Sequence, residues 1–132
     1  MTKRLLIVDD AILMRMRIRD IAREAGWEIA GEAANGQEAV ARYSELGPDL
    51  VTLDIVMPTM DGVEALREIR RVDPTARVVM VSAVDQREKL TECIRLGATD
   101  FIVKPFDKSS LREVFDRLNR DDRRETAITP AD

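Results

Sequence analysis

The fold is indicated first by the stretch Leu5-Leu6-Ile7-Val8-Asp9-Asp10, a short apolar run that ends directly in two carboxylates. Three later apolar runs have the same form: residues 50–53 lead into Asp54, residues 78–81 into Ser82 and residues 101–103 into Lys104. In an open parallel sheet, groups at the carboxyl ends of the strands meet in one crevice. Carboxylates, a hydroxyl and an ammonium group in one crevice suit a divalent cation and a phosphoryl group.

Between these runs the apolar residues recur at helical spacing. The predicted strands are residues 4–8, 28–32, 50–53, 77–81 and 101–103. The clearest helical pattern is that of Leu111, Val114, Phe115 and Leu118. We expect Asn35-Gly36 and Asp61-Gly62 to begin helices. Alternating strands and helices of this length predict one doubly wound α/β domain with a parallel sheet.

Composition narrows the class of protein. The 132 residues fit one domain, and 45% hydrophobic residues are enough for a core without disulfides. A net charge of −4 argues against a nucleic-acid partner, which would require a basic surface. No apolar stretch approaches a membrane span or a signal peptide, and one cysteine cannot form an internal disulfide. We therefore expect a cytoplasmic protein that binds neither nucleic acid nor membrane.

Histidine is absent from the sequence. The chain therefore contains no Ser-His-Asp triad, no Cys-His pair and no histidine-ligated zinc, and it cannot itself carry phosphohistidine. The chemistry that remains uses carboxylates, hydroxyls, lysine and a hard metal ion.

Each polar group at a strand end also has an ordinary structural explanation. Asp9 and Asp10 could cap the next helix. Ser82 could be a helix N-cap, and Lys104 could simply be solvated. Adjacent carboxylates repel each other, however, and a third one at Asp54 increases the repulsion unless a cation offsets it. Mg²⁺ suits such an all-oxygen site, with Mn²⁺ as an alternative ion.

Three motifs resemble the receiver domain of two-component response regulators: residues 6–10, Asp54-Ile55-Val56-Met57-Pro58 with Asp61-Gly62, and Lys104-Pro105-Phe106. The resemblance covers about residues 3–118, and segments 11–21, 32–40 and 100–106 resemble the single-domain chemotaxis regulators of that family. It implies a flavodoxin-like (βα)5 three-layer sandwich with five parallel strands in the order 2-1-3-4-5. The receiver domain would span residues 1–119. Because residues 120–132 are polar and lack periodicity, we expect them to form a disordered tail.

The resemblance also implies roles for the phosphoryl-binding residues. Asp54 would be the phosphoacceptor, and Lys104 and Ser82 would bind the phosphoryl oxygens. The Lys104–Pro105 peptide bond would be cis. Ser82 and Phe101 would form a switch that changes the surface made by the fourth helix, fifth strand and fifth helix. Phe101 has no hydroxyl group, so packing alone would carry that change.

A metal site is implied by the same resemblance. Asp10, Asp54 and the backbone carbonyl of Val56 would bind Mg²⁺ directly, and Asp9 would act through water. Val56 and Val84 would flank the phosphoryl group, where polar side chains can orient an attacking water molecule. Two valines would exclude that water, so we expect slow self-dephosphorylation and a need for a phosphatase or reverse transfer to histidine.

The function implied is that of a stand-alone, monomeric phosphoacceptor signalling protein, not an enzyme. It would accept its phosphoryl group from a histidine kinase of the chemotaxis type and bind an output protein such as a flagellar switch component. A phosphorelay intermediate that serves a histidine phosphotransfer protein would have the same site, so that alternative stays open. A haloacid-dehalogenase-like phosphatase would need a second acid two residues after its nucleophile, where this chain has Val56.

Four arginines lie on the first predicted helix: Arg15, Arg17, Arg19 and Arg23. They predict either a solvated basic face or a docking face for an acidic surface on the phosphodonor.

Overall fold

The computed structural model describes residues 2–120. Strands and helices alternate in the order β1 (Arg4–Val8), α1 (Ile12–Glu24), β2 (Glu28–Ala33), α2 (Gly36–Leu46), β3 (Leu50–Asp54), α3 (Gly62–Val72), β4 (Val78–Ala83), α4 (Arg87–Arg95), β5 (Asp100–Lys104) and α5 (Lys108–Arg120). The expected tail lies outside the described residues, apart from Arg120, which is the last residue of α5.

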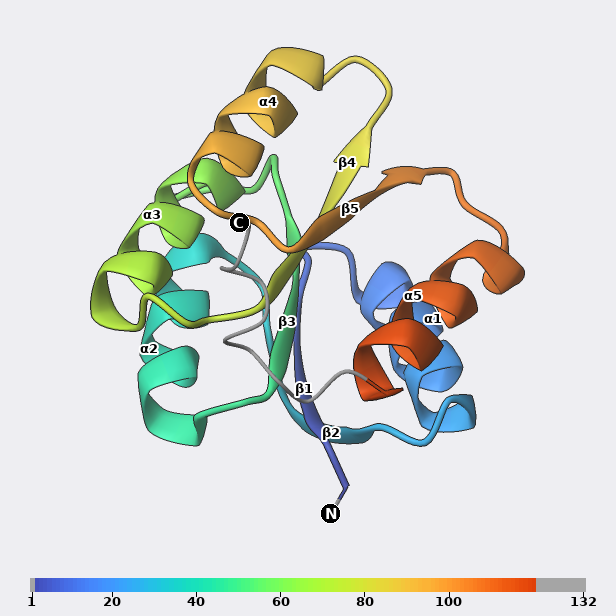
Figure 1. The fold of residues 1–132 in the computed structure, drawn as a ribbon. Coiled ribbons are helices and arrows are strands. Elements are labelled where there is room, and N and C mark those ends of the chain that lie inside the picture. Colours follow the sequence, from blue (N-terminus) through green and yellow to red (C-terminus); the bar gives the residue numbers. More distant parts are fainter. Residues whose placement is uncertain (1, 121–132) are drawn as a thin grey trace, which may run out of the picture.

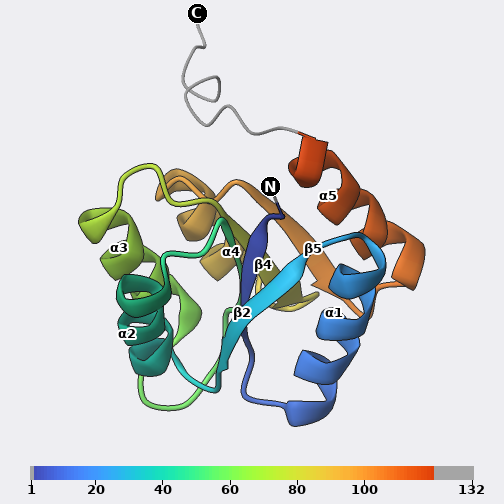
Figure 2. The same cartoon turned by 90° about the horizontal axis from the view of Figure 1, so that it is seen from below.

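The five strands form one sheet in the order β2-β1-β3-β4-β5, and every pair is parallel, which confirms the predicted topology. Figures 1 and 2 show α1 and α5 on one face of the sheet and α2, α3 and α4 on the other. The register pairs Val8 of β1 with Leu53 of β3, and Leu53 with Met80 of β4. The carboxyl ends of the three central strands therefore lie side by side.

The core has two halves because side chains alternate across the sheet. Leu5 and Ile7 of β1 pack with Phe115 of α5 in the cluster beneath α1 and α5. Leu6 and Val8 belong to the cluster on the opposite face. A strand buried on both faces needs a continuous apolar run, and that requirement explains the composition of β1, β3 and β4.

Two helices begin where the sequence predicts. The Asn35 side chain accepts a hydrogen bond from the Glu38 backbone N–H at the start of α2, and Asp61 accepts one from the Glu64 N–H at the start of α3. Both are N-cap bonds that satisfy an otherwise unpaired donor. Within residues 2–120, no helix is both long enough and apolar enough to cross a membrane.

The loop between β3 and α3 is tightly constrained. The Gly62 N–H donates to the Ile55 carbonyl oxygen at 2.6 Å, and a Cβ at position 62 would overlap the Asp54 carbonyl oxygen. Thr59 adopts a positive φ of 72°. This left-handed conformation is unfavourable for a β-branched residue, at about 1–2 kcal/mol.

We expect Thr59→Asn to raise the free energy of unfolding by about 1 kcal/mol, because asparagine tolerates the left-handed region far better than threonine. Urea denaturation followed by circular dichroism measures the change. Thr59→Ala is the control for loss of the hydroxyl group, and it should change the stability less than Thr59→Asn does. A Thr59→Asn protein no more stable than wild type would contradict the strain assigned to this residue.

Candidate functional site

Three carboxylates converge at the carboxyl edge of the sheet. Asp9 and Asp10 directly follow β1, and Asp54 is the last residue of β3. One oxygen atom from each lies within 4.8 Å of the others. Asp9 and Asp54 are buried, with Asp9 only 1% exposed, whereas Asp10 is open to solvent. A buried group of carboxylate oxygens with one accessible side fits a hard divalent cation such as Mg²⁺.

Lys104, at the end of β5, lies over the two buried acids. Its Nζ atom donates a hydrogen bond to Asp9 Oδ2 at 3.0 Å and lies 3.4 Å from Asp54 Oδ1. The side chain is 24% exposed, so the simple solvated alternative does not describe it. Burial alone would lower the pKa of Lys104, but the hydrogen bond to Asp9 and the charge of Asp54 outweigh burial and raise it. The lysine is therefore held in its charged form. The Lys104–Pro105 peptide bond is cis.

The surroundings of Asp54 raise the pKa of its carboxyl group. Burial raises the pKa of Asp54 from 3.8 to about 6, and the nearby negative charge of Asp9 acts in the same direction. Lys104 opposes the shift through its charge and a hydrogen bond. The carboxylate is consequently ionised at neutral pH, but its surroundings destabilise the ionised form. A further positive charge placed beside it would stabilise that form.

Ser82 carries a buried hydroxyl group near the strand ends that bear the carboxylates. It lies in β4 one residue beyond Val81, which pairs with Asp54 in the sheet register. The side chain is 1% exposed, and its Oγ atom has no hydrogen-bond partner among residues 2–120. Gln86, not Ser82, occupies the N-cap position of α4, so the helix-cap explanation is wrong. An unsatisfied buried hydroxyl is unfavourable and calls for a ligand or another explanation.

No interaction described for residues 2–120 joins the other predicted residues, Val56, Val84 and Phe101, to this centre. Val56 and Val84 are 48% and 75% exposed. Both are apolar residues on the loops that follow β3 and β4. Phe101, on the edge strand β5, is 42% exposed, so its ring is not part of the buried core.

Sequence reasoning noted the arginines of α1 but did not assign the contacts that they make. Arg15 donates to the backbone carbonyl of Asp9 at 2.6 Å and forms an ion pair with Glu32 at 3.0 Å. Arg19 lies 3.6 Å from the same glutamate. Arg17 donates to the Phe106 carbonyl at 2.7 Å. All three arginines therefore have partners within the protein; Arg15 and Arg19 are half-buried, whereas Arg17 remains exposed.

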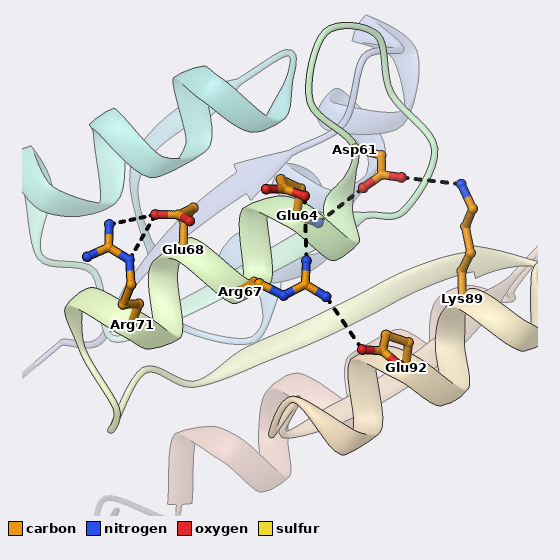
Figure 3. A network of polar contacts seen from close by, with 7 residues as sticks. All are labelled: Asp61, Glu64, Arg67, Glu68, Arg71, Lys89 and Glu92. Atoms are coloured by element: carbon orange, nitrogen blue, oxygen red, sulfur yellow. Dashed lines mark hydrogen bonds and ion pairs between the residues drawn. The ribbon is translucent and has the colours of Figure 1, made fainter.

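A second polar region lies between α3 and α4 (Figure 3). Lys89 forms an ion pair with Asp61 at 3.2 Å, and Arg67 lies 3.5 Å from both Glu64 and Glu92. A groove of about 290 Å³ runs beside this network. Its lining includes none of the three converging carboxylates, and most of its charges are already paired. The acidic cluster at the sheet edge is therefore the better candidate for a reaction centre.

Comparisons with known proteins agree with this geometry. Residues 5–116 match the family model of the response regulator receiver domain. The chain is 51% identical to the chemotaxis protein CheY of Thermotoga maritima over 120 residues, covering 91% of this chain and 100% of that protein. It is 50% identical to CheY of Bacillus subtilis over 117 residues, covering 89% and 98%. The CheX–CheY–BeF3–Mg²⁺ complex from Borrelia burgdorferi matches with a TM-score of 0.80 and 39% identity, covering 84% of each chain.

The pKa of Asp54 makes a prediction for stability in metal-free buffer containing EDTA. Because the folded-state pKa is about 6 and the ordinary value is 3.8, the folded protein binds more protons than the unfolded chain between these pH values. The contribution of Asp54 to stability should therefore fall as pH rises from 4 through 6. Asp54→Asn removes that cost, and we expect it to be about 2 kcal/mol more stable than wild type at pH 8 and nearly equal at pH 4.

Urea denaturation at a series of pH values measures this difference. Asp85→Asn, which makes the same change from carboxyl to amide at an exposed position, is the control. A constant difference between Asp54→Asn and wild type from pH 4 to pH 8 would mean that ionisation of Asp54 does not destabilise the fold.

Proposed function

We propose that this chain, which belongs to the response regulator receiver family and is a phosphoacceptor signalling protein rather than a catalytic enzyme, is a stand-alone chemotaxis regulator phosphorylated on Asp54. The observation that carries the proposal is the Lys104 ammonium group, which bridges the buried carboxylates of Asp9 and Asp54. Several relatives of similar length are chemotaxis proteins, and this favours chemotaxis over a phosphorelay. We assign the receiver domain to residues 1–119, acting as a cytoplasmic monomer.

In the proposed reaction, an Asp54 carboxylate oxygen attacks the phosphorus atom of a phosphohistidine on the kinase. A P–O bond forms and the P–N bond breaks, leaving its electron pair on the imidazole nitrogen, which regains a proton if solvent supplies one. No general base is needed because Asp54 is already ionised at neutral pH. Lys104 would move from the carboxylate to a phosphoryl oxygen, and the unpartnered hydroxyl of Ser82 would donate to another.

We assign the metal site to Asp10, Asp54 and the backbone carbonyl of Val56, with Asp9 acting through water. Bound Mg²⁺ would supply positive charge that neutralises the transferred group. The three convergent carboxylates fit this ion, and the related complex from Borrelia burgdorferi contains Mg²⁺ together with BeF3, which becomes tetrahedral, like a phosphoryl group, when an oxygen ligand binds its beryllium atom. Mn²⁺ has similar ligand preferences and is the alternative ion.

The output step follows from Ser82 and Phe101. Once Ser82 turns toward the phosphoryl group, it leaves space behind it, and Phe101, whose ring is exposed in this structure, would rotate inward. The surface formed by α4, β5 and α5 would then change and bind an output protein such as a flagellar switch component. A CheX-type phosphatase is a further partner, supported by the complex in which CheX binds a related protein.

The first experiment is phosphorylation by acetyl phosphate with Mg²⁺, followed by intact mass. We expect one phosphate on wild type, none on Asp54→Asn and none when EDTA removes the metal. Lys104→Ala should slow the reaction by about 10²-fold, because it removes a charge that stabilises the transferring group. The matched control, Asp85→Asn, should behave as wild type. A wild-type protein that stays unmodified, or a phosphate that persists on Asp54→Asn, would refute the proposed function.

The valines at the rim make a separate prediction for the lifetime of the phosphorylated state. We expect the double variant Val56→Asn, Val84→Glu to lose its phosphate at least about tenfold faster than wild type, because polar groups there can orient a water molecule for attack. The decay is followed by intact mass after the donor is removed. Val72→Asn, at an exposed position on α3, is the control. Equal lifetimes for wild type and the double variant would refute the role of the valines.

A further inference from the structure

We propose that Arg17 is a positioning residue for phosphoryl transfer: it holds the loop after β5 so that Lys104 stays between Asp9 and Asp54. The inference rests on the proposed function, because Lys104 has a role in the reaction only if Asp54 is the phosphoacceptor. Neither the motif at the strand ends nor the predicted basic face of α1 requires such a contact.

Arg17 makes two contacts with Phe106, a residue of the loop after β5. Its Nη2 atom donates to the backbone carbonyl oxygen of Phe106 at 2.7 Å. Its guanidinium carbon lies 4.7 Å from the centre of the Phe106 ring. The hydrogen bond fixes the backbone, and the stacked cation fixes the ring. Phe106 is otherwise buried in the core cluster beneath α1 and α5, so the loop is anchored on both sides.

Only Pro105 separates Phe106 from Lys104. The pyrrolidine ring restricts φ at that position, so fewer backbone rotations can absorb a displacement of Phe106 before it reaches Lys104. The Lys104 ammonium group must lie close to two acids at once, at 3.0 Å from Asp9 and 3.4 Å from Asp54. A misplacement of about 1 Å at a reacting group can lower a rate by about 10²-fold.

Helix α1 connects this loop to the opposite side of the site. Arg15, two residues before Arg17, donates to the Asp9 carbonyl at 2.6 Å and is itself held by Glu32. Side chains of α1 therefore bind the backbone carbonyl of Asp9, just after β1, and that of Phe106, just after β5. Arginine suits such contacts because its planar group can donate in the plane while it stacks on an aromatic face, which lysine cannot do.

The test is the rate of phosphorylation of the full chain by acetyl phosphate. Arg17→Met keeps a long unbranched stem and good helix propensity but removes the donor and the charge. We expect the rate constant at saturating donor to fall about tenfold, with the Mg²⁺ concentration for half-maximal rate unchanged, since Arg17 contacts no carboxylate of the site. Arg17→Lys should recover part of the loss. The control is Arg23→Met, on the same helix, whose exposed side chain has no hydrogen bond or ion pair described within residues 2–120.

A double-mutant cycle separates positioning of Lys104 from general loosening of the protein. In a Lys104→Ala background, Arg17→Met should change the slow rate by less than about twofold, because there is no longer an ammonium group to position. The inference is overturned if Arg17→Met phosphorylates at the wild-type rate, or if it lowers the rate equally in both backgrounds. Failure of wild type itself to become phosphorylated would instead refute the proposed function.

Discussion

Mutual repulsion among Asp9, Asp10 and Asp54 is the interaction on which the site depends. Two of these carboxylates are buried, and burial together with the charge of Asp9 raises the pKa of Asp54. Lys104 offsets part of this unfavourable energy by lying close to Asp9 and Asp54. The negative charge that remains uncompensated favours the arrival of a divalent cation. The uncompensated negative charge that destabilises the metal-free protein thus favours the binding of a metal ion.

The surrounding fold prevents the carboxylates from moving apart to relieve that repulsion. Asp9 and Asp54 extend adjacent strands whose side chains are buried on both faces of the sheet. The start of α3 lies against the backbone of Asp54, and only glycine at position 62 permits that approach. A close-packed interior resists displacement, so the repulsion is retained instead of being relaxed.

Contacts around the site also connect it to the surfaces that the proposed function requires to change. Lys104 and Phe101 belong to the same strand, and Ser82 to its neighbour β4. A second connection is the ion pair between Lys89 of α4 and Asp61, the residue that caps α3 (Figure 3). Asp61 is close to Asp54 in the chain. Under the proposed function, a new charge on Asp54 would act on α4 and β5 through these two short routes.

The sequence by itself determined the alternation of strands and helices, the capped starts of α2 and α3, and the gathering of Asp9, Asp10, Asp54 and Lys104 at one edge of the sheet. These features follow from local periodicity and from the direction shared by parallel strands. Only the tertiary structure decided that Lys104 lies nearer to Asp9 than to Asp54. It likewise decided that Ser82 does not cap a helix and has no hydrogen-bond partner for its Oγ atom among residues 2–120. It also decided that Arg17 reaches Phe106, 89 residues away in the chain. Such contacts depend on how separate segments pack in space, and no local pattern of residues encodes a distance between them.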